Sequence, residues 1–219
     1  MRRNRSGSPP SQYRKEWDKS AVNSATRFIS PKWNAATVIA CDKGYVYAKR
    51  CGIVPDLVVS DFDSYTDAID PDVPVYPFPS EKDDTDTMIA IRYAIEHGFD
   101  SVVLYCALGG RLDHTLANLQ SLVFAQRHGL SASLVEKDNC VYTLQNGSMR
   151  VPRREGWAFS VFAAEDRCTG LCIRGAKYPL EEAELTSSFP LGVSNEWACP
   201  EIELCVESGI LLIVLSRLQ

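Results

Sequence analysis

Two kinds of hydrophobic pattern alternate along the first two thirds of the chain. Short continuous apolar runs, typical of buried strands, occur at residues 37–41, 57–60, 75–78, 101–106, 131–136 and 140–144. Apolar residues at helical spacing lie between them, at residues 45–51, 85–96 and 113–127. Strands and helices that alternate through short connections predict an α/β fold with a doubly wound, mostly parallel sheet.

The two ends of the chain depart from this alternation. Residues 1–11 are polar and rich in Ser, Pro and Arg, so we expect them to be loose. An amphipathic helix is predicted next, because apolar side chains recur at nearly helical spacing at Tyr13, Trp17, Ala21, Ala25 and Phe28.

After Asn146-Gly147 the pattern changes to short β-rich runs, at residues 158–163, 171–174, 202–206 and 210–215. Ser208-Gly209 separates the last two and predicts a hairpin turn. We therefore predict two domains, an α/β domain over residues 1–146 and a small β-sandwich over residues 147–219.

Composition narrows the classes of function. The chain has 219 residues and a net charge of −5, which argues against a general nucleic-acid binder. No apolar stretch approaches the ~18 residues of a membrane span, and no signal peptide is apparent. The eight cysteines include no CxxC pair, and most lie within apolar runs, which favours a reduced, cytoplasmic protein.

Acidic residues gather at two strand ends. Asp61 and Asp63 follow the buried run 57–60 and project to the same face of an extended chain, and Asp83 and Asp86 share a face at a helix start. Carboxylates held this close raise each other's pKa unless a cation lies between them, and Mg²⁺ is the usual cation beside phosphates. The alternative is ordinary turn and cap chemistry, with Ser80 as the N-cap.

Three further segments carry candidate chemistry. Residues 109–114 (GGRLDH) join a strand end to a helix start, where glycines, amides and the Arg111 guanidinium suit phosphate. Asp42-Lys43-Gly44 lies at the same kind of junction and could contact a nucleotide or simply cap a turn. Residues 192–197 (GVSNEW) combine hydroxyl, amide and aromatic groups.

These segments together resemble the thiamine pyrophosphokinase (thiamine diphosphokinase) family. Residues 55–64 read PDLVVSDFDS where the family has PDLVVGDFDS, and residues 82–86 (KDDTD) resemble its KDxTD. Residues 109–119 match GGRLDHxLANL, and residues 175–178 and 192–196 are similar to its KGxKY and GxSNE segments. The resemblance runs in order from about residue 37 to the C-terminus.

The resemblance implies transfer of a pyrophosphoryl group from ATP to thiamine by a homodimer with an α/β domain and a C-terminal β-sandwich. It implies that Mg²⁺ and the phosphates are held by Asp61, Asp63 and Asp86, with Asp83 in the same catalytic pocket. ATP would be bound by Asp42, Lys82, Gly109, Gly110, Arg111 and Asp113. Thiamine would be bound by Ser194, Asn195 and Trp197.

The chain departs from the family pattern at three places. Ser60 replaces a glycine, Lys43 replaces a glycine after Asp42, and residues 1–10 lack the apolar strand that usually opens the family's fold. Two other functions stay open at this point: a pyrophosphokinase acting on another heteroaromatic alcohol such as a pterin, and a non-catalytic thiamine- or nucleotide-binding protein.

Overall fold

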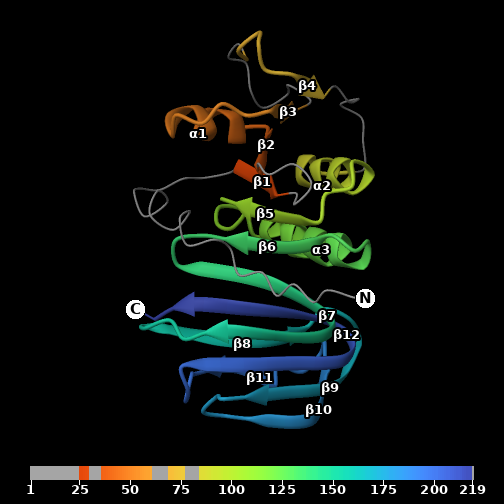
Figure 1. The fold of residues 1–219 in the computed structure, drawn as a ribbon, viewed down its shortest axis with the longest axis vertical. Coiled ribbons are helices and arrows are strands. Elements are labelled where there is room, and N and C mark those ends of the chain that lie inside the picture. The colour runs from red at the N-terminus through yellow and green to blue at the C-terminus, as the bar shows by residue number, and fades with distance from the viewer. Residues whose placement is uncertain (1–24, 30–35, 61–68, 77–83, 219) are drawn as a thin grey trace, which may run out of the picture.

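A twelve-stranded mixed sheet forms the frame of the chain in a computed structural model that describes residues 25–29, 36–60, 69–76 and 84–218 (Figure 1). The first half contains β1 (Ala25–Ile29), β2 (Ala36–Cys41), α1 (Gly44–Arg50), β3 (Leu57–Val59), β4 (Val75–Tyr76), α2 (Asp86–Glu96), β5 (Ser101–Tyr105), α3 (Leu112–Arg127) and β6 (Ser131–Val135). The second half contains only strands: β7 (Asn139–Pro152), β8 (Trp157–Ala163), β9 (Arg167–Arg174), β10 (Leu180–Thr186), β11 (Gly192–Asn195) and β12 (Glu201–Arg217).

Five strands of the α/β half run in the same direction. β2 pairs in parallel with β3, β3 with β4, and β5 with β6. β1 lies between β2 and β5 and is antiparallel to both, so β2 and β5 are parallel to each other. The carboxyl ends of β2 to β6 therefore lie along one edge of the sheet, which we call the carboxyl edge.

β1 corrects one expectation from the sequence. Residues 25–28 lie in a strand and not in the predicted helix, and the remainder of that predicted helix lies outside the described residues. Residues 1–10, which lack the apolar strand that usually opens the family's fold, lie outside the described part, and β1 occupies the place between β2 and β5. β1 is the one antiparallel strand among the six described strands of the α/β half, and together with the antiparallel strands of the β-rich half it makes the whole sheet mixed.

The predicted hairpin at Ser208-Gly209 is wrong, because β12 continues through it as one strand. β12 pairs with β7 from Glu201 to Ser216, with a bulge between Val206 and Ile210. Asn146, with φ of 44°, lies opposite this bulge, and its Oδ1 accepts a hydrogen bond of 2.9 Å from the Gly209 N–H. Asn146-Gly147 of β7 and Ser208-Gly209 of β12, both with the composition of a turn, therefore lie opposite each other in the paired strands. A bulge at such a point bends the sheet but does not end the strand.

The bend lets one half of β12 pair with β9 and the other half pair with β8. The apolar side chains of these strands enclose one core, which includes Phe159, Leu171, Leu204 and Ile213. A second core lies between the helices and the parallel strands and includes Ile91, Leu104 and Leu122. The sequence missed β10 and β11, whose exposed positions hide the alternation expected of strands.

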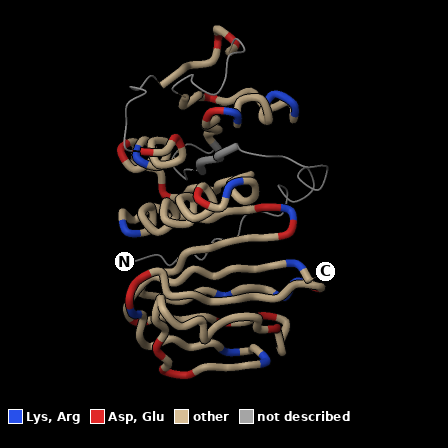
Figure 2. Tube along the Cα trace, turned by 180° about the vertical axis from the view of Figure 1, so that it is seen from behind, with Lys and Arg blue, Asp and Glu red and all other residues tan. Residues whose placement is uncertain are grey.

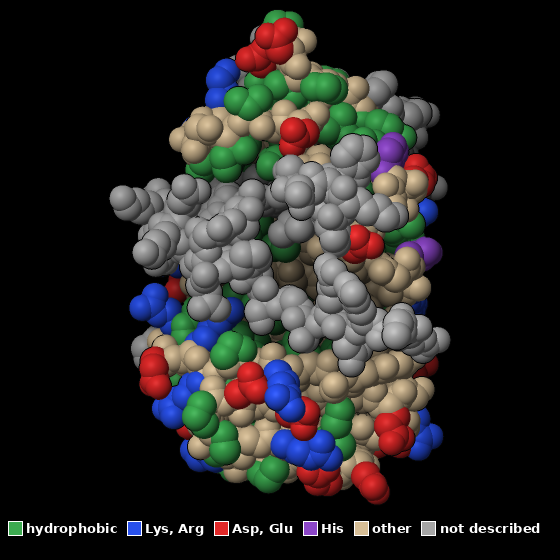
Figure 3. Space-filling view, in the orientation of Figure 1, with side chains coloured by type: hydrophobic (Ala, Val, Ile, Leu, Met, Phe, Trp, Pro, Cys, Tyr) green, Lys and Arg blue, Asp and Glu red, His purple; other side chains and the backbone are tan. Residues whose placement is uncertain are grey.

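Charged residues of both signs are interspersed along the described chain, without a continuous basic stripe (Figure 2). In the face drawn in Figure 3, blue and red side chains alternate over the β-rich half. None of the described helices is long and apolar enough to cross a membrane.

Candidate active site

The predicted site residues divide into those that the structure describes and those that it does not. Asp61, Asp63, Lys82 and Asp83 lie outside the described residues. Within the described part of the chain, no group of three or more His, Cys, Asp and Glu side chains gathers as a metal site. The elements that flank these four residues, β3 and α2, are described and carry the neighbouring candidates.

Asp42 lies at the carboxyl edge, directly after β2, with a positive φ of 52°. Its backbone N–H donates to the Val59 carbonyl at 3.0 Å, which joins the ends of β2 and β3. The hydroxyl of Ser60 is buried and donates to Asp42 Oδ1 at 3.0 Å. Ser60, which replaces the family's glycine and has no positive φ, thus orients the Asp42 carboxylate.

Asp86 is the first residue of α2, and α2 begins beside the end of β2. Thr85 is the N-cap, since its hydroxyl accepts a hydrogen bond from the Met88 N–H at 3.2 Å. The Cys41 thiol donates to the Asp86 carbonyl at 3.7 Å. This contact brings the half-buried Asp86 to the part of the edge where Asp42 lies. Thr85 fulfils the capping role that the turn-and-cap interpretation gave to Ser80.

The loop after β5 reaches the same edge with open backbone. Gly109 and Gly110 have φ of 92° and 70°, and a Cβ added to either would meet no atom within 4 Å. Arg111 and Asp113 are exposed and form an ion pair in which Arg111 Nε donates to Asp113 Oδ1 at 3.1 Å. This hydrogen bond raises the pKa of Arg111 and lowers the pKa of Asp113.

Two side chains that the sequence analysis did not select form hydrogen bonds with the backbone of this loop. Asn118 Nδ2 donates to the Ala107 carbonyl at 2.8 Å, and Glu136, just after β6, accepts from the Leu108 N–H at 3.3 Å. Burial raises the pKa of the Glu136 carboxyl, and hydrogen bonds from the loop backbone oppose that rise. Two features of the sequence could have identified these residues. Asn118 lies within the motif of residues 109–119, and Glu136 is the last residue of the predicted strand 131–136.

In the β-rich half, the predicted thiamine-binding residues have unlike environments. Ser194 is exposed with φ of 57°, and its N–H donates to Ser160 Oγ at 3.0 Å. Asn195 is buried, and its amide bonds both the N–H and the carbonyl of Tyr178, at 3.0 and 2.7 Å. The side chain of Asn195 therefore joins β11 to the loop that follows β9.

Trp197 is buried in the core of the β-rich half. Its Nε1 donates to the Val151 carbonyl at 3.1 Å, and its ring meets Phe159 edge to face at 5.0 Å. A hollow of about 260 Å³ lies beside β11, lined by residues 161–163 and 185–190. Phe189, which lines the hollow, is one of the exposed large apolar side chains of the β-rich half; the others are Tyr178, Leu191, Val193 and Leu218.

The fold and these positions define a mixed α/β protein with polar side chains at the carboxyl ends of parallel strands, where such sheets bind ligands. Residues 30–134 match the model of the thiamin pyrophosphokinase catalytic domain, and residues 147–211 match that of the thiamin pyrophosphokinase vitamin B1 binding domain. The chain belongs to the thiamine pyrophosphokinase family.

Individual relatives agree with this assignment. The thiamine pyrophosphokinase of Bacillus subtilis (strain 168) is 30% identical over 185 residues, which cover 81% of this chain and 86% of the relative. The crystal structure of thiamine pyrophosphokinase from Bacillus subtilis matches with a TM-score of 0.75 at 30% identity, covering 82% of this chain and 86% of that chain. The structure from Geobacillus thermodenitrificans matches with a TM-score of 0.71 at 26% identity, covering 82% and 85%.

Proposed function

We propose that this protein is a thiamine pyrophosphokinase. It transfers the pyrophosphoryl group of ATP to the hydroxyethyl oxygen of thiamine and releases AMP. The observation that carries the proposal is the match of both family domains, in order, along one chain. In the reaction, a bond forms between the thiamine oxygen and the β-phosphorus of ATP, the bond from that phosphorus to the α-phosphate bridging oxygen breaks, and the alcohol loses its proton.

The carboxyl edge is the proposed ATP site. Gly109 and Gly110 leave room for phosphates to approach the backbone, and Arg111 supplies a planar cation suited to phosphate oxygens. Asp42, Lys82 and Asp113 complete the proposed contacts. The Asp113 partner holds Arg111 at the helix start and must share it with the nucleotide.

Asp61, Asp63 and Asp86 are the proposed ligands of Mg²⁺. Asp86 lies at the carboxyl edge, and Asp61 and Asp63 follow in sequence after β3, which ends at that edge. Carboxylate oxygens are the donors that Mg²⁺ takes beside phosphates. When bound, the ion would neutralise phosphate charge during transfer. Asp83 is proposed to lie in the same catalytic pocket.

The β-rich half is the proposed thiamine-binding domain, and the active form is proposed to be a homodimer. Ser194 has an exposed hydroxyl that can contact thiamine. Asn195 and Trp197 are buried beside it and fix the surrounding backbone through hydrogen bonds to Tyr178 and Val151. Tyr178, Phe189, Leu191 and Val193 are 44–65% exposed, and large apolar side chains on the surface favour a contact with a second subunit.

The direct test incubates the protein with Mg·ATP and thiamine and measures AMP and thiamine diphosphate. We expect both products in equal amounts. AMP formed only with a pterin alcohol would reject thiamine as the substrate, and thiamine binding without AMP would reject catalysis. Asp63→Asn should abolish turnover with an unchanged melting curve, and near-normal turnover would remove Asp63 from the mechanism.

A further inference from the structure

Two cysteines lie directly opposite each other on neighbouring strands of the β-rich half. Cys205 of β12 is the register partner of Cys172 of β9, and Cys205 Sγ lies 3.9 Å from the Cys172 carbonyl oxygen. Opposed residues of an antiparallel pair have Cα atoms about 4.5–5.5 Å apart. Disulfides span Cα distances of about 4.4–6.8 Å. The backbone spacing therefore suits a disulfide, although both thiols are free.

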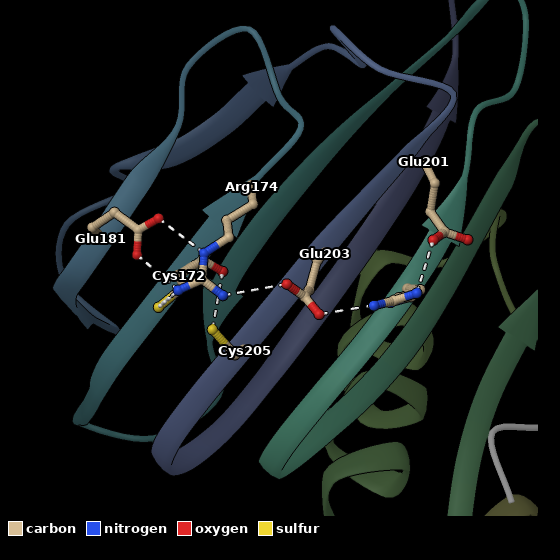
Figure 4. A network of polar contacts seen from close by, with 7 residues as sticks. Cys172, Arg174, Glu181, Glu201, Glu203 and Cys205 are labelled. Atoms are coloured by element: carbon tan, nitrogen blue, oxygen red, sulfur yellow. Dashed lines mark hydrogen bonds and ion pairs between the residues drawn. The ribbon is translucent and has the colours of Figure 1, made fainter.

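A fixed cation lies against one of the two sulfurs (Figure 4). Arg174 Nη2 donates to Cys172 Sγ at 3.6 Å. Two carboxylates hold the same guanidinium, with Arg174 Nε at 3.0 Å from Glu181 and Nη1 at 3.2 Å from Glu203. These contacts fix the guanidinium, and through it the position of Cys172 Sγ, on the face that Cys172 shares with Cys205.

The second sulfur is the more accessible of the two. Cys205 is half-buried, whereas Cys172 is buried. Burial, and next the neighbouring Cys172 thiol, raise the pKa of Cys205 to about 11. The other charged groups along this face are Arg150 of β7, which pairs with Glu203 at 3.6 Å, and Glu201. Only a small fraction of Cys205 is therefore thiolate near neutral pH, and that fraction grows as the pH rises.

We propose that Cys172 and Cys205 form a modification site for low-molecular-weight disulfides, which convert the pair to a cross-strand disulfide. The Cys205 thiolate attacks one sulfur of the oxidant, forms a mixed disulfide and releases one thiol. Cys172 Sγ, which lies opposite on β9, then loses its proton, attacks Cys205 Sγ and expels the second thiol. The two protein thiols lose two protons and two electrons, and the oxidant disulfide gains them as two thiols.

The other cysteines provide an internal comparison. No other register pair in the described strands places two cysteines opposite each other. Cys51 and Cys199 are exposed, so an oxidant reaches them without an opposed thiol to complete the exchange. These two should hold the small thiol as a mixed disulfide, while Cys172 and Cys205 should release it.

The test treats the reduced full chain with oxidised glutathione at pH 8.5, quenches with acid, alkylates the free thiols and maps the peptides by mass spectrometry. We expect the Cys172 and Cys205 peptides to become linked with loss of two hydrogens, and the link to disappear with dithiothreitol. The folded protein should give this link alone, whereas urea-unfolded protein should give links among several cysteines, because only the fold sets Cys172 opposite Cys205. Cys51→Ser should leave the link unchanged, and Cys205→Ser should remove it.

Three results would overturn the proposal. One is glutathione retained on Cys205 without a link to Cys172. Another is both thiols still free when Cys51 is fully modified. The third is a link from either cysteine to Cys199. All three results are measured as linked or modified peptides of the unsubstituted protein. They therefore depend neither on how a variant folds nor on the proposed enzymatic activity.

Discussion

The α/β half and the β-rich half place their motif residues in opposite ways. At the carboxyl edge, Gly109, Gly110 and Arg111 are exposed at a junction between strand and helix. In the β-rich half, Asn195 and Trp197 are buried and bonded to backbone of neighbouring segments. Membership in a motif therefore has two physical meanings here: a group available to a ligand, or a group that shapes the surface on which a ligand is held.

The difference follows from how each half is built. Parallel strands end along one edge of the sheet. The loops at that edge are held in place by the strands, so their polar groups can face a ligand. A β-rich half has no such common edge, so its loops must be joined to one another. Asn195 does this by satisfying both backbone groups of Tyr178. Ser194 stays exposed beside it.

The largest effect that separates the two halves should come from Asp86→Asn. If Asp86 holds Mg²⁺ at the carboxyl edge, removing its charge should lower kcat by about a thousandfold, roughly 4 kcal/mol of transition-state stabilisation. Steady-state kinetics with thiamine and Mg·ATP measure this. Asp84→Asn is the matched control, because Asp84 forms an exposed ion pair with Arg92 at 2.8 Å and should change kcat little. Equal losses in both variants would reject the role of Asp86.

A large loss of stability is expected from Gly209→Ala in the bent strand β12. Gly209 has φ of 115°, and an added Cβ would lie 2.6 Å from Cys168 Sγ and 3.1 Å from Cys168 Cα. We expect the free energy of unfolding to fall by about 3 kcal/mol. Gly98→Ala is the control, since its φ is 70° but no atom lies within 4 Å, and it should cost about 1 kcal/mol. Urea unfolding of both variants measures the difference, and similar losses would contradict the close packing at the bend.

Asn195→Ala should destabilise the β-rich half by about 2 kcal/mol, because it leaves the N–H and carbonyl of Tyr178 without their partner. Ser194→Ala should leave the free energy of unfolding within about 0.5 kcal/mol and instead raise the KM for thiamine. Thermal unfolding and kinetics on the two variants make the comparison. A stable Asn195→Ala protein with only a raised KM would place Asn195 among the ligand contacts.

The sequence predicts the elements of the α/β half well, because its strands are short apolar runs and its helices are amphipathic. α2, β5 and α3 begin and end within one residue of the predicted ranges. Helical spacing misled at residues 25–28, where Ala25 and Phe28 are compatible with either a helix or a strand.

The β-rich half was harder to predict because its signals depend on distant partners. Ser208-Gly209 has the composition of a turn, but the Asn146 side chain, far away in sequence, satisfies the Gly209 N–H and lets the strand continue. The positioning roles of Ser60 and Glu136 are likewise tertiary, since each acts on a segment that folding brings beside it. The proposed roles of Asp61, Asp63, Lys82 and Asp83 stay predictions.

The smallest expected effect is on the free energy of unfolding and comes from Glu136, which accepts a hydrogen bond from the loop at the carboxyl edge. Burial raises the pKa of Glu136 in the folded protein above its ordinary value, so the native state binds the proton more tightly than the unfolded state. Stability should therefore fall as the pH rises from the ordinary carboxyl range through the raised pKa, because the ionised carboxylate is partly removed from water. Glu136→Gln keeps an acceptor for the Leu108 N–H without the charge.

The Glu136→Gln variant should be more stable than the unsubstituted protein at pH 7, by less than about 1 kcal/mol, and the gain should vanish at acid pH. Urea unfolding from pH 4 to 8 measures this, with Glu155→Gln at an exposed carboxylate as the control that should shift stability little. A loss of stability at pH 7 would mean that the loop that contains Leu108 and Gly109 is stabilised by the charge of the Glu136 carboxylate. The support of the carboxyl edge would then be ionic, unlike the neutral amide support that Asn195 gives to the β-rich half.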